Sequence, residues 1–185
     1  MTAERRAPAQ RCVPSACLVG LAALSAAACD RFRPGGPRKS QPALVVQQMG
    51  DTKLTVTYNR PVARGRTLFG GIVPFGRVWD PGADEATTLA VSRDVRFGGK
   101  PLPAGTYSVW AIPDSLTWTV ILSRASRVPH TPYPEGQDAL RLAVAPARAP
   151  HMEALAFYFP VADSAHVVLA LHWGETLVEL PVTRR

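Results

Sequence analysis

Apolar and polar side chains alternate with a period of two residues through most of the chain after Leu44. Successive side chains along a β-strand point to opposite faces, so this pattern predicts strands that each bury one face. No segment longer than about ten residues has a clean helical period. The clearest alternating segments are KLTVTYN (53–59), TYSVWAI (106–112), TWTVILS (117–123), DALRLAVA (138–145) and LAFYF (155–159).

Turn residues separate these segments at intervals typical of antiparallel sheets. Gly98-Gly99 and Pro113-Asp114 lie between predicted strands, and Gly174-Glu175 predicts a terminal hairpin between HVVLALHW and TLVELPV. A short helical turn near 133–139 is the one helical element that the pattern allows. About nine strands with no intervening helices indicate an all-β domain, either an antiparallel β-sandwich or a flattened barrel.

The start of the chain does not belong to this domain. Arg5, Arg6 and Arg11 precede an uncharged apolar run at 13–28, which is the layout of an export signal peptide covering residues 1–28. The run is shorter than the ~20 residues of a membrane-spanning helix. It ends in Ala26-Ala27-Ala28-Cys29, similar to the cleavage box of bacterial lipoproteins, which predicts acylation of Cys29 and attachment to the lipid bilayer. Because Ala26 and Ala28 also suit ordinary signal peptidase, an unmodified soluble form stays the alternative.

Residues 29–42 follow as a flexible basic tether. The net charge of +7 lies mostly in the signal and the tether, because the body from Gln41 onward has 14 Lys and Arg against 12 Asp and Glu, a net of +2. This balance argues against nucleic acid as a partner. All three cysteines stand at positions 12, 17 and 29, so the domain expected at 43–185 has to be stable without disulfides. We expect a monomer, exported to the cell envelope on the periplasmic or outer side.

The stretch YNRPVARGRTLFGGIVPFGRVWDPGADEATT (58–88) is the candidate site, because irregular loops longer than ~12 residues are uncommon in compact domains and often functional. Guanidinium groups pair with carboxylates or phosphates, and tryptophan with acids suits a sugar or another polar metabolite. The candidate ligand-binding residues are Arg60, Arg64, Arg66, Trp79, Asp84 and Glu85.

A structural role for the same stretch is the alternative. Arg60 or Arg66 would then bridge to Glu85 or to backbone carbonyls, pinning a long connection, while Phe69, Phe75 and Trp79 fill the core beneath it. A second long loop, SRVPHTPYPEGQD (126–138), would frame a cleft if it folded against the Trp79 region. A pocket that contains Arg66, Trp79 and Glu85 together would favour binding.

Other chemistries find little support in the sequence. There is no Gly-x-Ser-x-Gly, no dinucleotide or Gly-Lys-Ser/Thr phosphate fingerprint, and no cysteine after Cys29. His166 and His172 stand six residues apart, roughly 20 Å along a strand, which is too far for one metal ion. We therefore expect surface histidines, no metal and no cofactor. A hydrolase that uses Glu85 or Asp84 as acid or base, and a structural or assembly protein without a pocket, remain the alternatives to a binding protein.

The stretch 58–88, LPAGTYSVWAIPDSLTWTVILSR (102–124) and the closing LALHWGETLVELPV together resemble the bacterial domain-of-unknown-function family 2911, from about Val45 to Val182. The resemblance implies a secreted or lipid-anchored, mostly β protein without an established activity. Relatives usually read Trp-Arg-Thr-Gly-Ala-Asn-Glu where this chain has Asp80 and Pro81 after Trp79. If that arginine binds a ligand in relatives, the resemblance implies that binding is lost or altered here.

Overall fold

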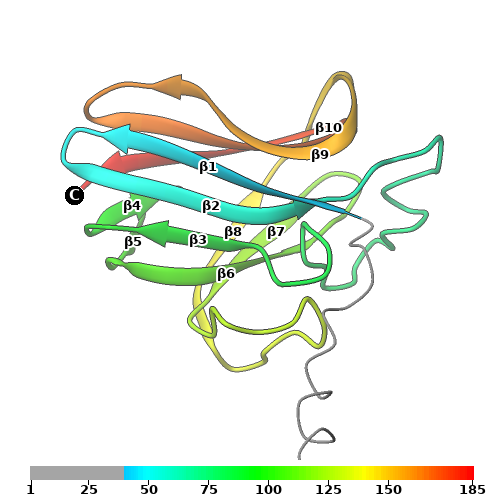
Figure 1. The fold of residues 1–185 in the computed structure, drawn as a ribbon, viewed down its shortest axis with the longest axis horizontal. Helices are drawn as coiled ribbons and strands as arrows, with labels where there is room; N and C mark the ends of the chain where they lie inside the picture. The colour runs from blue at the N-terminus through cyan, green and yellow to red at the C-terminus, as the bar shows by residue number, and fades with distance from the viewer. Residues whose placement is uncertain (1–39) are drawn as a thin grey trace, which may run out of the picture. The chain divides into compact units, whose positions relative to one another are not determined.

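The computed structural model describes residues 40–185, which fold into two antiparallel β-sheets packed face to face (Figure 1). No helix occurs in this part of the chain, and none there is long and apolar enough to cross a membrane. The all-β sandwich expected from the alternation is therefore confirmed, with ten strands instead of about nine and two separate sheets instead of a closed barrel. The predicted signal peptide, most of the tether and Cys29 lie outside the described residues.

One sheet has six strands and the other has four. The six-stranded sheet contains, in spatial order, β1 (Gln41–Met49), β2 (Thr52–Arg60), β3 (Thr88–Val91), β6 (Gly105–Ile112), β7 (Trp118–Ser123) and β8 (Asp138–Val144). The four-stranded sheet contains β5 (Lys100–Leu102), β4 (Val95–Phe97), β10 (His166–Arg184) and β9 (Ala147–Ala162).

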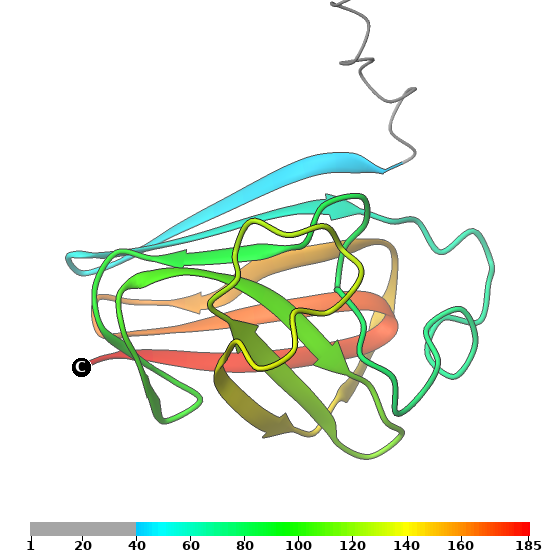
Figure 2. The same cartoon turned by 90° about the horizontal axis from the view of Figure 1, so that it is seen from below.

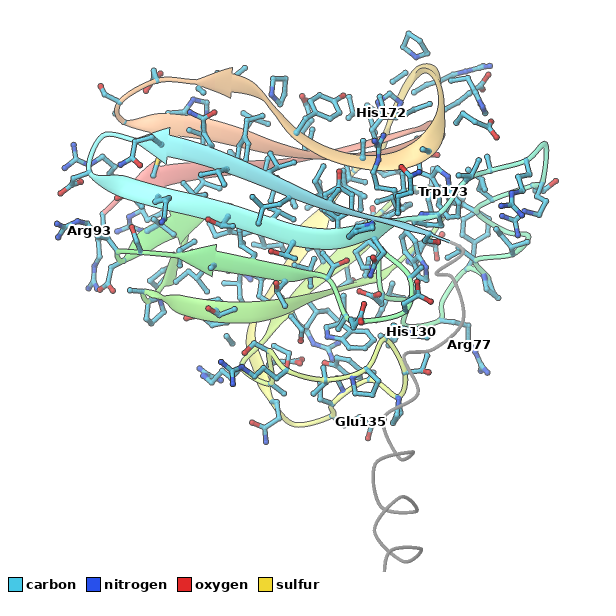
Figure 3. All side chains as sticks on the ribbon, in the orientation of Figure 1. Arg77, Arg93, His130, Glu135, His172 and Trp173 are labelled. Carbon is cyan, nitrogen blue, oxygen red and sulfur yellow. The ribbon has the colours of Figure 1, made fainter. Side chains whose placement is uncertain are left out.

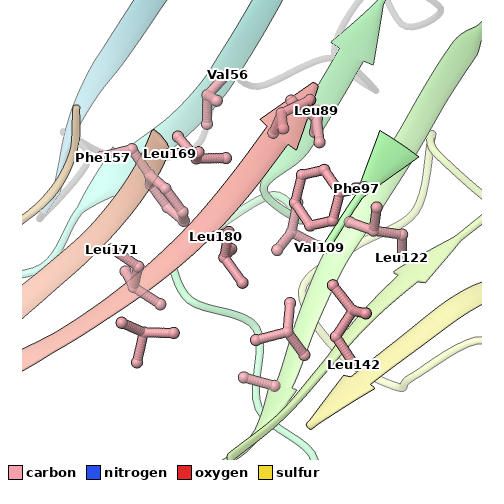
Figure 4. Packing of buried hydrophobic residues seen from close by; sticks show 14 of the residues in the cluster. Val56, Leu89, Phe97, Val109, Leu122, Leu142, Phe157, Leu169, Leu171 and Leu180 are labelled. Carbon is pink, nitrogen blue, oxygen red and sulfur yellow. The ribbon is translucent and has the colours of Figure 1, made fainter. Parts of the chain in front are cut away.

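The period-two pattern places the core between the sheets. In β2, Leu54, Val56 and Tyr58 are buried, whereas Lys53 and Thr57 are exposed. Side chains from both inner faces interdigitate in the same way along the other strands. Figure 4 shows this layer, with Val56, Leu89, Val109 and Leu122 facing Phe157, Leu169, Leu171 and Leu180.

The C-terminal strand reverses direction within itself. The backbone N–H of Arg184 donates a hydrogen bond of 3.1 Å to the carbonyl of Ala165, so the two ends of β10 lie side by side (Figure 1). Gly174 has a φ of 59°, which a glycine adopts without steric cost. The reversal thus falls at the Gly174-Glu175 pair that the sequence indicates.

A second, smaller apolar cluster lies on the outer face of the six-stranded sheet, where the loop 124–137 covers it (Figure 2). Trp110 packs there against Ile121 and meets Tyr133 edge-to-face at 5.3 Å. The helical turn expected near 133–139 is absent, and bends and turns take its place. The prolines of this loop and the positive φ of Gly136, 75°, disfavour a helix.

Candidate functional site

The connection between β2 and β3 crosses one end of the sandwich and is fixed there by backbone hydrogen bonds. The N–H of Ala63 donates to the carbonyl of Glu153 at 2.8 Å, and Trp79 exchanges two bonds of 2.8 Å with Ala111. The N–H of Gly76 donates to Pro113 O at 2.9 Å. Backbone contacts to β9, to β6 and to the β6–β7 turn therefore hold this irregular segment in place.

Two of the candidate arginines donate to backbone carbonyls. Arg60 Nε lies 3.1 Å from Leu155 O, and Arg66 donates through Nε to Ala63 O at 2.9 Å and through Nη2 to Val62 O at 2.6 Å. These are the bonds that the structural alternative anticipates for a pinned connection. They also occupy donors that an anionic ligand would need.

Arg64 and an acid that the sequence did not single out form a third anchor. Arg64 has an exposed side chain and a φ of 52°, and its backbone N–H donates to Glu153 Oε1 at 2.7 Å. Bonds from His151 and from this N–H hold the pKa of Glu153 below its ordinary value. Glu153 stands in an alternating strand and carries no motif, so only the tertiary fold reveals its role.

Trp79 belongs to an aromatic cluster beneath the connection. Its ring stacks on Trp173 with centroids 6.0 Å apart and planes at 13°, and it meets Phe69 edge-to-face at 5.7 Å. Trp118 completes the cluster and is buried. Phe75 differs from the expectation, because it is 44% exposed instead of filling the core.

The acidic end of the connection contacts the second long loop. Asp84 has a φ of 67°, and its carbonyl oxygen lies 2.7 Å from His130 Nδ1. Glu85 forms a β-bridge with Pro129, and the N–H of Ala86 donates to Val128 O at 3.3 Å. The loop 126–138 therefore folds against residues 84–86 and not against Trp79, which changes where a cleft is expected.

A groove of about 660 Å³ lies between these two segments and the outer face of β2 and β3. Its lining includes Asn59, Asp84, Glu85, Ser126, Arg127 and Pro129. Asn59 Nδ2 holds the rim by donating to Ala83 O at 2.7 Å and to Glu85 Oε2 at 2.9 Å.

The structure does not bring all the predicted site residues together. Asp84 and Glu85 line this groove, whereas Arg66 borders a separate hollow of about 260 Å³ beside Trp173. Glu85 and Arg66 therefore line different hollows, and Trp79 lines neither of these two.

Asp80 is a buried acid in the segment between Trp79 and Asp84. Its side chain is 4% exposed, Oδ1 accepts the N–H of Thr87 at 2.9 Å, and Oδ2 has no hydrogen-bond partner. Burial raises its pKa to about 7 against opposing contributions from Thr87 and His130. Pro81 supports the same turn, because its carbonyl accepts the Thr87 hydroxyl at 3.0 Å. Asp80 thus closes the turn that leads to Asp84.

One of the histidines differs from the prediction that all of them lie on the surface. His172, expected on the surface, is buried, with Nε2 3.0 Å from Pro150 O and Nδ1 3.2 Å from the Tyr158 hydroxyl. His151 lies in β9 and pairs with Glu153. Figure 3 shows His172 and His130 in separate parts of the sandwich. Within residues 40–185, no group of three His, Cys, Asp or Glu side chains could hold a metal ion.

Comparison with known families gives a match to the sandwich. A family model described as "Protein of unknown function (DUF2911)" matches residues 40–182, which covers almost the whole sandwich. Neither the curated proteins nor the solved structures contain a match to the chain.

Proposed function

We propose that this chain, which belongs to the DUF2911 family, is a cell-envelope binding protein that holds a small polar ligand between residues 84–88 and 126–129. The observation that carries this proposal is the groove of about 660 Å³ on the outer face of the six-stranded sheet. A volume of this size falls within the usual range of ligand sites, roughly 300–1,000 Å³.

The backbone of the groove supports the same conclusion. Asp84 is a non-glycine residue in the left-handed region, with a φ of 67°. Such conformations are costly and cluster at sites where a side chain has to be held in one direction. The contacts of Asn59 with Ala83 and Glu85, and of His130 with Asp84, fix this rim before any ligand arrives.

The lining indicates the chemistry of the ligand. Apolar atoms of Ala86, Val128 and Pro129 form much of the wall, and Asp84 and Glu85 supply two carboxylates. Arg127 supplies the cationic group of the lining. A ligand with an apolar ring and amino or hydroxyl groups fits this set, as an amino sugar does. The anionic ligand suggested by Arg60 and Arg66 is less well supported, since both guanidinium groups donate to carbonyls.

The sequence supports the proposed location. Three arginines, the apolar run 13–28 and the small residues before Cys29 have the order of a lipoprotein signal. In this proposal, acylated Cys29 attaches the protein to the bilayer, and the body projects into the periplasm or from the outer surface.

A thermal-shift experiment with defined probes tests the binding proposal. Glucosamine should raise the Tm of the wild-type protein, whereas glucose 6-phosphate should not. Asp84→Asn should reduce the shift, and Asp114→Asn should not, because Asp114 is an exposed acid that lines a different hollow. Equal shifts in the two variants, or a response to the phosphate alone, would contradict the proposal.

If the protein is a hydrolase instead of a binding protein, one experiment should give a different result. Glu85 and Asp84 both line the groove, so an acid or base at either position would reach a bound substrate. Glu85→Gln would then abolish turnover of a chromogenic glucosaminide while glucosamine still raises the Tm. If the wild-type protein does not turn over the glucosaminide, binding remains the function proposed for the groove.

A further inference from the structure

Four large apolar side chains project from one end of the sandwich, outside the groove. Ile72, Phe75 and Val78 are 45%, 44% and 39% exposed on the connection between β2 and β3, and Leu116 is 80% exposed in the β6–β7 turn. The two segments are joined, because Gly76 N donates to Pro113 O at 2.9 Å. We call these four side chains the apolar tips.

Basic residues accompany the apolar tips. The segment 61–79 contains Arg64, Arg66 and Arg77 and no acidic residue. Figure 3 shows Arg77 projecting from the edge of this end. Asp114 is the acid in the adjoining turn. Exposed apolar side chains interspersed with arginine are typical of surfaces that sit at the boundary of an anionic bilayer, where the chains enter the headgroup region and the guanidinium groups bind phosphates.

The entry of the chain into the sandwich lies at the same end. Gln41, at the start of β1, pairs with Arg60, the last residue of β2, and the segment with the apolar tips follows directly (Figure 1). Cys29 stands eleven residues before Ser40 in the sequence, and eleven residues span at most ~40 Å. An anchor at Cys29 therefore keeps this end closer to the bilayer than the opposite end. This step rests on the lipid attachment proposed above.

We infer that this end of the sandwich docks on an anionic lipid bilayer, with Ile72, Phe75, Val78 and Leu116 entering the headgroup boundary and Arg77 at its rim. The docking surface is separate from the ligand groove, which lies on the outer face of the six-stranded sheet. It orients the anchored body instead of leaving it free to rotate on its tether.

Site-specific quenching in vesicles tests the docking. The mature protein recovered from membranes is reconstituted in phosphatidylcholine vesicles with and without phosphatidylglycerol, both containing lipids brominated near the headgroup. L116W places an indole at the most exposed tip. S164W is the matched control, because Ser164 is exposed and its turn adjoins Gly50 and Arg184 at the opposite end.

Docking predicts that bromolipid lowers the emission that L116W adds to that of the four native tryptophans by more than about half, since interfacial groups lie about 5–10 Å deep. The emission that S164W adds should stay nearly unchanged. Adding Arg77→Glu should weaken the quenching of L116W in the anionic vesicles. Equal quenching at both positions would overturn the inference. If the protein floats with the vesicles and neither position is quenched, the inference is also overturned. A protein partner would then remain as the occupant of this end.

The same experiment separates docking from anchoring. Protein that fails to float with vesicles contradicts both the lipid attachment and the docking. Protein that floats without quenching of L116W contradicts the docking alone. Quenching that persists in the Cys29→Ala variant shows that the apolar tips bind the bilayer without the acyl group.

Discussion

The backbone N–H of Phe157 in β9 donates a hydrogen bond of 3.0 Å to the hydroxyl of Tyr58 in β2. The two rings also meet edge-to-face with centroids 4.9 Å apart. A side chain of one sheet thereby satisfies a buried backbone group of the other. Arg60, two residues further along β2, repeats the arrangement by donating to Leu155 O.

Tyr58→Phe should destabilise the protein by about 1–3 kcal/mol, because it leaves the buried N–H of Phe157 without an acceptor. Urea unfolding followed by circular dichroism measures the change. Tyr107→Phe is the matched control, since the Tyr107 hydroxyl donates to Pro103 O in an exposed turn, where water can replace it. A loss for Tyr58→Phe no larger than that for Tyr107→Phe would show that the inter-sheet bond contributes little.

Asp80 should make stability fall as the pH rises. Its pKa is about 7 in the folded protein against an ordinary value of 3.8, so the folded state holds the proton more tightly than the unfolded chain. The stabilisation is therefore complete below about pH 4 and is lost between about pH 4 and 7, with a total of about 4 kcal/mol. Unfolding in urea at pH 5 and pH 8 should show the difference.

Asp80→Asn should abolish most of this pH dependence, since the amide does not titrate and its oxygen can still accept the N–H of Thr87. Asp94→Asn serves as the control. Asp94 is exposed and its pKa is lowered, chiefly by the N–H of Ala104, so its contribution is lost only as the pH falls through the acid range. A wild-type slope that survives in Asp80→Asn would assign the titration to another group.

Gly174→Ala should be more destabilising than an ordinary substitution of glycine. A Cβ at this position would stand 2.7 Å from Leu68 Cδ1, and the φ of 59° is unfavourable for alanine. We expect a loss of about 1–3 kcal/mol from strain and contact together. Gly99→Ala isolates the backbone part, because Gly99 has a φ of 78° with no atom within 4 Å of the added carbon. Similar Tm values for the two variants would argue against the contact with Leu68.

The mass of the protein recovered from membranes should reveal the processing at Cys29. Acylation predicts a chain that begins at Cys29 with a mass increment the size of a diacylglycerol, and Cys29→Ala should release the body into the soluble fraction. The control is Cys17→Ala, which lies within the predicted signal and should leave the mature mass unchanged. An unmodified soluble wild-type protein would support ordinary signal peptidase instead.

The strands were predictable because burial of one face leaves a period-two trace in the residues themselves. Leu54, Val56 and Tyr58 show this pattern, and the reversal at Gly174 follows from the turn preference of glycine. Neither feature needs knowledge of distant contacts.

The candidate site was predictable only in part, since its contacts join segments far apart in the sequence. Any residue can supply the backbone carbonyl that accepts the hydrogen bond from Arg66. The sequence therefore cannot distinguish an arginine that binds a carbonyl from one that binds a ligand. The burial of Asp80 and of His172 depends on neighbours that only the packed sheets supply. The proximity of Val128 to Ala86 likewise depends on the path of two irregular loops, which has no periodicity to read.

The bond between Phe157 and Tyr58 spans 99 residues of sequence, and this separation sets the order in which the protein can form. Pairings of such long range are slow to form, because the intervening chain has to be closed into a loop first. Until β9 pairs across the sandwich, the apolar face of the β1–β2 hairpin lacks this cover. Closure of the two sheets is therefore expected late in folding, after the local hairpins.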